Sequence, residues 1–250
     1  MRIAVAGGTG TVGRHVVDVL RERGHDPVIL TRSAGVDLVT SGGLAGSLDG
    51  VDAVIDVSST TTLSDAASRA FFGAVTRNLL AAEVEAGVGH HVALSIVGTA
   101  DAPYGYYAGK LLQEQLVEAA PVPWTILRAT QFHEFSAQIL DRMKAGPFVV
   151  VPRMQSQPVA AREVAERLVT LATGTPAGRA PDVAGPRVER LADMVRRYTK
   201  AAGRSERIVE VPLPGAYGTA MRDGTLLPRP GADLGVQTFD EWVAAVPAAV

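Results

Sequence analysis

The chain has 250 residues, with 24 Lys or Arg, 26 Asp or Glu, a formal charge of -2 and no Cys. The missing cysteines exclude disulfides, thiolate nucleophiles and cysteine-ligated metal centres, and the balanced charge gives no sign of a nucleic-acid partner. The N-terminus enters an apolar strand rather than a signal peptide, and no apolar stretch reaches the ~18 residues of a membrane helix. We therefore expect a soluble, cytoplasmic protein without a membrane partner.

The first half of the chain alternates short β-rich runs with helical stretches. This alternation predicts an α/β fold, a doubly wound parallel Rossmann sheet built by right-handed crossovers. The expected strands are Arg2–Ala6, Pro27–Thr31, Ala53–Val57, His91–Ile96 and Trp124–Arg128, and the expected helices are Val12–Arg23, Ala66–Ala86 and Gly109–Ala119. In the glycine-rich segment after the second strand we expect a weak strand over Val36–Val39 and a compact helix over Gly43–Leu48.

The pattern changes after Arg128. The elements expected there are a helix over Phe132–Ala145, strands over Phe148–Pro152 and Gln157–Ala160, helices over Arg162–Ala172 and Leu191–Ala202, a strand over Ile208–Val211 and a helix over Phe239–Val246. No low-complexity linker separates the two halves. The sequence thus predicts a dinucleotide-binding domain over 1–130 and a small C-terminal substrate-binding lobe over 131–250, packed together as one body.

A glycine-rich turn follows the first expected strand. Gly7 permits the tight turn, Gly10 removes a side chain where a pyrophosphate approaches, and Gly13 lets the next helix pack closely on the sheet. The helix N-terminus offers free N–H groups to the same anion. A strand before and a helix after the turn favour a dinucleotide site over an ordinary turn. The turn residues expected to bind the cofactor are Gly7, Thr9, Gly10, Thr11, Val12 and Gly13.

The end of the second expected strand indicates which dinucleotide binds. An NAD site usually has Asp or Glu there, for the ribose hydroxyls, but this strand ends Leu30-Thr31-Arg32-Ser33. The planar guanidinium of Arg32 suits a 2′-phosphate, and Arg14 lies close enough in the chain to assist. We therefore expect NADP (NADPH) rather than NAD, the alternative being that both arginines are solvated surface residues.

The turn Gly7–Gly13, Arg32 and the segment Pro123–Arg128 together resemble the atypical and extended short-chain dehydrogenase/reductase superfamily, most closely its NmrA-like, NAD(P)H-binding branch. The resemblance covers roughly residues 1 to 145, and its most specific run is Trp124–Phe132, where Ala129 stands in place of a common proline. The resemblance implies that the side chain of Asp37 binds the adenine amino group. Further cofactor contacts that it implies are Leu38, Val57, Ser58 and Ser59.

Tyr106-x-x-x-Lys110 is the candidate catalytic motif, because residues four apart share one face of a helix. A cation near the phenol would favour the phenolate and lower the pKa of Tyr106. The resemblance implies that Tyr106 exchanges a proton with the substrate oxygen, Lys110 holds the nicotinamide ribose and Ser95 orients the substrate. Phe72 stands where the superfamily has a helix asparagine, so that proton relay is absent. The alternative is a tyrosine that only lines the cleft.

Residues after the last strand of the first half are candidates for the substrate pocket. We expect Gln131, Phe132, His133 and Phe135 to line it, the alternative being packing and capping at a helix start. His133-Glu134 lacks a second histidine at zinc-binding spacing, so we expect no metal. The adjacent His90 and His91 point to opposite faces of a strand and cannot chelate together. We interpret them as a surface turn.

These features predict an NADP-dependent oxidoreductase that reduces a small carbonyl, alkene or quinone-like molecule. One alternative is a non-catalytic NAD(P)H-binding redox sensor of the NmrA-like type, which would regulate a partner without turnover. Another is a sugar-nucleotide epimerase or dehydratase, which the small size of the C-terminal part disfavours. The sequence leaves the substrate's identity and the oligomeric state open.

Overall fold

The computed structural model describes residues 1–247, which form two compact units. Unit 1 contains Met1–Arg128 and Arg162–Pro181, and unit 2 contains Ala129–Ala161 together with the described chain from Asp182 onward. The predicted single boundary near residue 130 therefore misses the return of the chain to unit 1 at Arg162. That the two units pack as one body stays a prediction.

Unit 1 is built on a parallel sheet with the strand order β5-β4-β3-β1-β2, and the short strand β9 lies beside β5. Its strands are β1 (Arg2–Ala6), β2 (Asp26–Leu30), β3 (Ala53–Asp56), β4 (His90–Ile96), β5 (Trp124–Ala129) and β9 (Gly178–Arg179). The almost entirely apolar strands β1 and β3 are buried in the middle of the sheet, as strands covered on both faces are. The predicted Rossmann-like α/β fold is confirmed.

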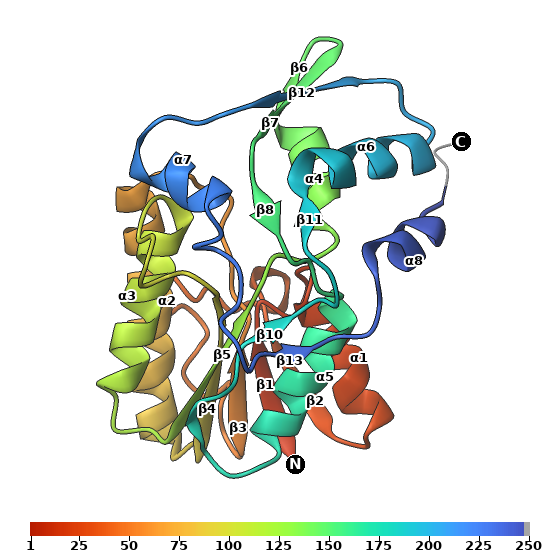
Figure 1. Ribbon diagram of the computed structural model, residues 1–250. Helices are drawn as coiled ribbons and strands as arrows, with labels where there is room; N and C mark the ends of the chain where they lie inside the picture. The colour runs from red at the N-terminus through yellow and green to blue at the C-terminus, as the bar shows by residue number, and fades with distance from the viewer. Residues whose placement is uncertain (248–250) are drawn as a thin grey trace. The chain divides into compact units, whose positions relative to one another are not determined.

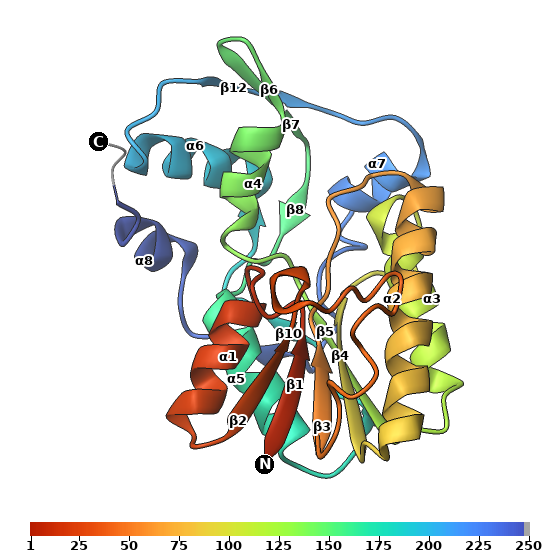
Figure 2. The same ribbon diagram turned by 180° about the vertical axis from the view of Figure 1, so that it is seen from behind.

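Helices cover both faces of this sheet (Figures 1 and 2). α1 (Gly13–Glu22) and α5 (Ala161–Ala172) lie on one face, and α2 (Asp65–Ala86) and α3 (Tyr106–Glu118) lie on the other. α2 begins where the Ser64 hydroxyl accepts a hydrogen bond from the N–H of Ala67, and it ends at a left-handed glycine. The two faces thus bury the apolar residues that the helical periodicity predicts.

The segment between β2 and β3 differs from the prediction. The expected strand Val36–Val39 and helix Gly43–Leu48 are wrong: a single turn of 3-10 helix (η1, Arg32–Ala34) is followed by turns and one isolated bridge between Asp37 and Gly42. The glycines decide this local structure. Gly43 has φ +71°, and a Cβ there would lie 2.1 Å from a backbone oxygen, so the chain turns where a helix would continue.

A side chain of α2 holds this irregular segment in place. Asn78 Nδ2 donates hydrogen bonds of 2.9 Å to the carbonyl oxygens of both Leu38 and Val39. Leu44 and Leu48 are buried in the same hydrophobic cluster as parts of β1, β3 and α2. Side-chain anchoring therefore replaces the missing ladder hydrogen bonds.

The interpretation of His90 and His91 as a surface turn is also wrong, because both lie in β4 with 4% and 0% of their surface exposed. They do point to opposite faces of the sheet, as a strand requires. His90 is hydrogen-bonded to Thr125 of β5 at 2.9 Å, and His91 Nδ1 donates to the buried Glu83 carboxylate of α2 at 2.8 Å. Each buried histidine is thus paired with a side chain of another element.

Unit 2 combines short helices with small sheets. Its helices are α4 (Phe135–Arg142), α6 (Leu191–Ala201), α7 (Gly215–Arg222) and α8 (Phe239–Ala244). Its strands are β6 (Lys144–Ala145), β7 (Phe148–Pro152), β8 (Gln155–Ser156), β10 (Val183–Ala184), β11 (Glu189–Arg190), β12 (Arg207–Val211) and β13 (Asp233–Leu234). They form the sheet β12-β7-β6, the pair β11-β8, and the pair β13-β10, of which β10 also pairs with Ala129.

Two predictions in this unit are corrected. The helix expected over Phe132–Ala145 is shorter, because Lys144–Ala145 pairs with β7 as a hairpin strand. The strand expected over Gln157–Ala160 forms only one bridge, between Phe132 and Val159. No helix within residues 1–247 combines the length and the apolar character that crossing a bilayer requires.

Candidate functional site

The glycine turn of unit 1 is packed too tightly for side chains. Gly7 has φ +80°, and a Cβ there would lie 2.9 Å from the carbonyl oxygen of Val57, beyond the carboxyl end of β3. A Cβ on Gly13 would lie 2.1 Å from the carbonyl oxygen of Gly7. Gly10 N donates to that same oxygen at 2.9 Å, which closes the turn. The backbone is thus free to approach a ligand closely, as the spacing of the glycines predicts.

The start of α1 leaves its first N–H groups without a side-chain cap. Val12 is the N-cap residue, it makes no side-chain capping hydrogen bond, and the first turn contains no acid. Thr9 and Gly10 are exposed, and Thr11 is half-buried. Uncapped N–H groups at a helix N-terminus form an anion site. The cradle therefore fits the pyrophosphate of a dinucleotide.

Two exposed arginines lie near this turn in the chain. Arg32 follows the acid-free end of β2 and opens η1, and Arg14 is the second residue of α1. Within residues 1–247 neither guanidinium forms an ion pair or a hydrogen bond. Both therefore keep their donors available for a phosphate. Their role toward a 2′-phosphate stays a prediction.

Asp37 and Leu38 are held in the irregular segment after η1. The Asp37 carboxylate accepts hydrogen bonds from the N–H groups of Val39 and Thr40, at 2.9 and 3.3 Å, through a single oxygen. Leu38 is half-buried, and its carbonyl oxygen is bound by Asn78. The carboxylate is thus fixed in orientation, and its predicted contact with adenine stays a prediction.

The loop after β3 brings a buried hydroxyl beside the glycine turn. Ser58 N donates to Asp56 Oδ1 at 2.9 Å, and the Cα of Ser58 would lie 3.0 Å from a Cβ on Gly7. Ser58 Oγ is buried and has no hydrogen-bond partner among the described residues. A buried polar atom without a partner is costly. A ligand seated against the turn would supply one.

Tyr106 is the first residue of α3, and its hydroxyl shares a hydrogen bond of 3.1 Å with Ser59 Oγ. Its ring packs edge-on against Phe72, with the centroids 5.3 Å apart. Burial raises the pKa of Tyr106 to about 12, against a lowering effect of the Ser59 hydrogen bond. The expected lowering of this pKa by a nearby cation is therefore wrong: desolvation of the phenolate dominates.

Lys110 lies one turn further along α3 and is buried. Its ammonium donates to the carbonyl oxygen of Leu94 at 2.6 Å and to Oε1 of Gln113, and it lies 4.6 Å from the centre of the Phe72 ring. Burial lowers the pKa of Lys110 to about 8, although nearby Asp56 and Glu114 act to raise it. Phe72 thus contacts both Tyr106 and Lys110, while the ammonium is bound to the backbone of β4.

Gln113 and Asp56 complete this polar cluster, although they are not among the residues predicted from the sequence. Gln113 Nε2 donates to Asp56 Oδ2 at 2.7 Å, so the amide connects the Lys110 ammonium to a fully buried carboxylate. Two signals could have identified them. Gln113 is three residues after Lys110 on the same helix, and Asp56 is the only acid in the otherwise apolar strand Ala53–Asp56.

Ser95 lies in a polar network centred on Glu114. Its hydroxyl donates to Glu114 Oε1, which also accepts from Thr99 at 3.2 Å and from Arg128 at 2.8 Å. The second oxygen of Glu114 accepts from Arg128 at 2.6 Å and from Arg179 at 3.0 Å. The Ser95 hydroxyl is thus bound to Glu114, whereas the Tyr106 hydroxyl is bound to Ser59, and the role of Ser95 in orienting the substrate stays a prediction.

The predicted substrate residues all lie in unit 2. Gln131 Oε1 accepts a hydrogen bond of 2.8 Å from Ser156, and His133 Nε2 donates to the carbonyl oxygen of Gln237 at 3.2 Å. The His133 ring also packs among aromatic rings of α8. Phe132 and Phe135 are half-buried. Gln131 and His133 thus have structural partners, and substrate contacts for all four residues stay a prediction.

Residues 7–173, which include most of unit 1, match the protein family described as NAD(P)H-binding. A relative by sequence is the photosystem II assembly factor Ycf39 of Synechocystis sp. (strain ATCC 27184 / PCC 6803 / Kazusa), which is 27% identical over 236 residues, 85% of this chain and 71% of that protein. The chain is therefore similar to that assembly factor over most of its length.

Solved structures share the fold at low sequence identity. MoeE5 in complex with UDP-glucose and NAD is 17% identical, with a TM-score of 0.68 over 100% of this chain and 94% of that one. The UDP-glucose 4-epimerase of Thermus thermophilus, complexed with NAD, is 17% identical, with a TM-score of 0.67 over 98% and 100%. An NADPH-dependent quinone oxidoreductase from Escherichia coli is 15% identical, with a TM-score of 0.67 over 97% and 98%.

At these sequence identities, similarity to the solved structures shows only a shared fold. The family match, by contrast, covers more than half of the chain. The glycine cradle, the uncapped start of α1 and the order of the parallel strands agree with that match. The chain belongs to the NAD(P)H-binding family, with homology to extended short-chain dehydrogenase/reductase and NmrA-like proteins.

Proposed function

We propose that this protein binds NADPH in preference to NADH and uses it to reduce a small carbonyl, alkene or quinone-like molecule. The observation that carries the cofactor preference is Arg32. It is exposed, it forms no ion pair within residues 1–247, and it follows a strand that ends without an acid. An acid at that position would bind ribose hydroxyls and repel a 2′-phosphate, whereas a guanidinium binds the phosphate.

Different residues of unit 1 would bind the cofactor and transfer the proton. The turn Gly7–Gly13 and the start of α1 would hold the pyrophosphate, Arg32 and Arg14 the 2′-phosphate, and Ser58 Oγ would gain a hydrogen-bond partner. When bound, NADPH supplies the hydride. With a pKa of about 12, Tyr106 is a neutral phenol at neutral pH and retains a proton to donate, which suits reduction of a carbonyl.

The binding part is tested by measuring the dissociation constants of NADPH and NADH for the unmodified protein, Arg32→Ala and Arg21→Ala. Arg21 is also an exposed arginine, in the last turn of α1, away from the glycine turn. Arg32→Ala should weaken NADPH binding by about tenfold or more, since a charge-assisted contact contributes ~1.5–3 kcal/mol. Arg32→Ala should leave the dissociation constant of NADH unchanged. Arg21→Ala should leave the dissociation constants of both nucleotides unchanged. Equal loss for both nucleotides would refute the phosphate assignment.

The catalytic part is tested by following NADPH consumption with a panel of aldehydes, ketones, enones and quinones. Oxidation of NADPH with at least one class supports the proposal. Tight NADPH binding without consumption by any acceptor overturns it in favour of a second candidate, a dinucleotide-binding sensor that regulates a partner. The observation favouring that candidate is that Lys110 and Ser95 both have internal partners. The likeness to epimerases is one of fold, so epimerisation ranks behind both.

A further inference from the structure

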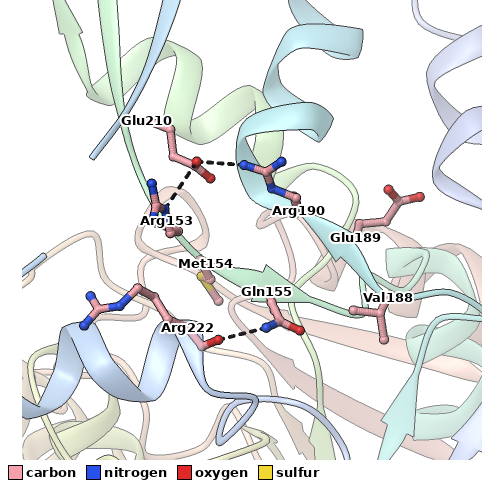
Figure 3. Close-up of a pocket in the computed structure, with 8 residues that line it drawn as sticks. All are labelled: Arg153, Met154, Gln155, Val188, Glu189, Arg190, Glu210 and Arg222. Atoms are coloured by element: carbon pink, nitrogen blue, oxygen red, sulfur yellow. Dashed lines mark hydrogen bonds and ion pairs between the residues drawn. The ribbon is translucent and has the colours of Figure 1, made fainter. Parts of the chain in front are cut away.

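A cavity of about 460 Å³ is lined entirely by residues of unit 2, none of which is expected to bind the dinucleotide. Polar side chains enter it from three strands (Figure 3): Arg153 and Gln155 from the chain that continues β7 into β8, Arg190 from β11, and Glu210 from β12. Met154 and Val188 supply an apolar wall. The cavity thus combines cationic groups with a small apolar surface.

Backbone hydrogen bonds fix the strands that carry these side chains. Gln155 and Arg190 are direct cross-strand partners in the antiparallel pair β8–β11. Arg153 N donates to the carbonyl oxygen of Val211 at 2.8 Å, which ties it to the strand that carries Glu210. Gln155 Nε2 donates to the main-chain oxygen of Arg222 at 2.8 Å, which leaves one amide N–H unused. The backbone that carries these groups is therefore ordered before a ligand binds.

Two arginines of the cavity, Arg153 and Arg190, share a single acid, Glu210. Arg190 Nη2 and Arg153 Nε lie 2.8 and 3.5 Å from the same oxygen of Glu210 (Figure 3). The other Glu210 oxygen is buried without a hydrogen-bond partner among the described residues. Glu189, the second acid of the lining, is already paired with Arg197. Asp193 lies 3.9 Å from Arg190 Nε and is a weaker neutralising partner.

We infer that this cavity binds the anionic group, a carboxylate or a phosphate, of a small molecule. Two guanidiniums carry ten N–H donors, and a single Glu210 oxygen occupies few of them. With 56% and 59% of their side-chain surfaces exposed, Arg153 and Arg190 present the rest to solvent. A planar carboxylate or a tetrahedral phosphate matches guanidinium geometry in a bidentate way. The remainder of the molecule would contact Met154 and Val188.

The test uses the full-length protein and three probes: inorganic phosphate, malonate and, as a neutral control, malonamide. The readout is the ¹H–¹⁵N NMR signals of the Arg153 and Arg190 Nε–H groups and of the Gln155 side-chain amide. Phosphate or malonate should shift these signals saturably, and malonamide should not. Saturation by malonate alone identifies a carboxylate site, and saturation by phosphate alone identifies a phosphate site.

Variants separate a built site from a general attraction of anions. Arg153→Gln and Arg190→Gln should each weaken binding by about tenfold. Glu210→Gln should tighten it, because the substitution removes the carboxylate that competes for both guanidiniums. Arg142→Gln is the matched control: Arg142 is an exposed arginine in the last turn of α4, outside the cavity. It should leave binding unchanged.

The dinucleotide site could bind the same probes, so the titration is repeated with Arg32→Gln, which should leave the signals of unit 2 unaffected. Because these signals come from unit 2, the result does not depend on whether the proposed function is correct. The inference fails if neither anion saturates these signals, if Arg142→Gln weakens binding as much as Arg190→Gln, or if folded Glu210→Gln binds more weakly. If thermal unfolding shows that Glu210→Gln does not fold, the comparison of Arg153→Gln and Arg190→Gln with Arg142→Gln decides.

Discussion

The surroundings of Tyr106 favour a proton donor over a proton acceptor. Burial raises the pKa of the phenol to about 12, and the Lys110 ammonium nearby in α3 is bound to the Leu94 carbonyl oxygen and to Gln113. The phenolate therefore gains too little from a cation to form at neutral pH. At neutral pH Tyr106 is therefore a neutral phenol, the protonated form that the proposed reduction of a carbonyl requires.

Tyr106→Phe tests this role, because it removes the hydroxyl and keeps the ring packed on Phe72. For a carbonyl substrate we expect the rate of NADPH oxidation to fall by about 10²–10⁴-fold, the usual contribution of a positioned acid. The dissociation constant of NADPH should stay the same, as measured by fluorescence titration. Tyr104→Phe, at an exposed tyrosine just before α3, is the control. An unchanged rate would assign Tyr106 to the lining of the cleft.

At the scale of an element, the glycine turn and α1 depend on backbone contacts that a single methyl group would break. Gly13→Ala places a Cβ 2.1 Å from the oxygen of Gly7 and 2.7 Å from the Cα of Gly8. Because both neighbours are backbone, relief requires α1 to shift away from the turn. We expect a loss of ~2–4 kcal/mol in the free energy of unfolding, by the scale of overpacking and backbone strain, and a loss of NADPH binding.

Gly89→Ala is the matched control for this substitution. A Cβ at Gly89 meets its nearest neighbour, the oxygen of Asp52, at an ordinary 3.5 Å. Urea unfolding and NADPH titration of the two variants therefore compare the same chemical change with and without a clash. If Gly13→Ala bound NADPH normally, the close approach of the backbone at Gly13 would not be needed for the site.

The contact between β4 and α2 predicts a pH dependence of stability. Burial acts to lower the pKa of His91, but the Glu83 carboxylate at 2.8 Å outweighs it, so the pKa is raised. The folded state thus holds the His91 proton more tightly than the unfolded state. This stabilisation is complete below the unfolded pKa of about 6.5 and is lost as the pH rises through the raised folded pKa.

Glu83→Gln should remove this dependence. The free energy of unfolding of the unmodified protein should fall from about pH 6.5 upward, and that slope should be absent in the variant. At about pH 6 the variant should be less stable by ~1–3 kcal/mol, the cost of leaving a buried group poorly paired. Urea unfolding at several pH values, with an NMR titration of His91, gives both quantities. Parallel pH profiles for the two proteins would contradict the assignment.

At the scale of the whole molecule, local sequence patterns predicted the fold, whereas the features they did not predict depend on contacts between different elements. The alternation of strands and helices and the spacing of Gly7, Gly10 and Gly13 are visible within short windows, and the parallel sheet follows from them. Burial of His91 depends on Glu83 in another element, and the Ser95 hydroxyl is bound by Glu114. No periodicity in the sequence encodes such pairs.

The return of the chain to unit 1 at Arg162 also depends on contacts between elements that are far apart in the sequence. Arg162 pairs with Glu22 of α1, and Arg23 donates to Thr170 of α5 at 2.9 Å. These contacts, with the pairing of β9 and β5, hold residues 162–181 in unit 1 although residues 129–161 intervene. The sequence shows each of these side chains, but not that a single α/β unit is assembled from two segments.

Hydrogen exchange with and without NADPH should show this assembly. A ligand that binds only the folded form raises the free energy of opening of the unit that holds it. If the dinucleotide binds at the glycine turn, backbone amides in residues 162–181 should gain protection together with those of β1, β2 and α1. Amides of α4 in unit 2 serve as the comparison within the same protein. Should residues 162–181 respond like α4 and unlike α1, the contacts of Arg162 and Arg23 would not make α5 part of the dinucleotide-binding unit.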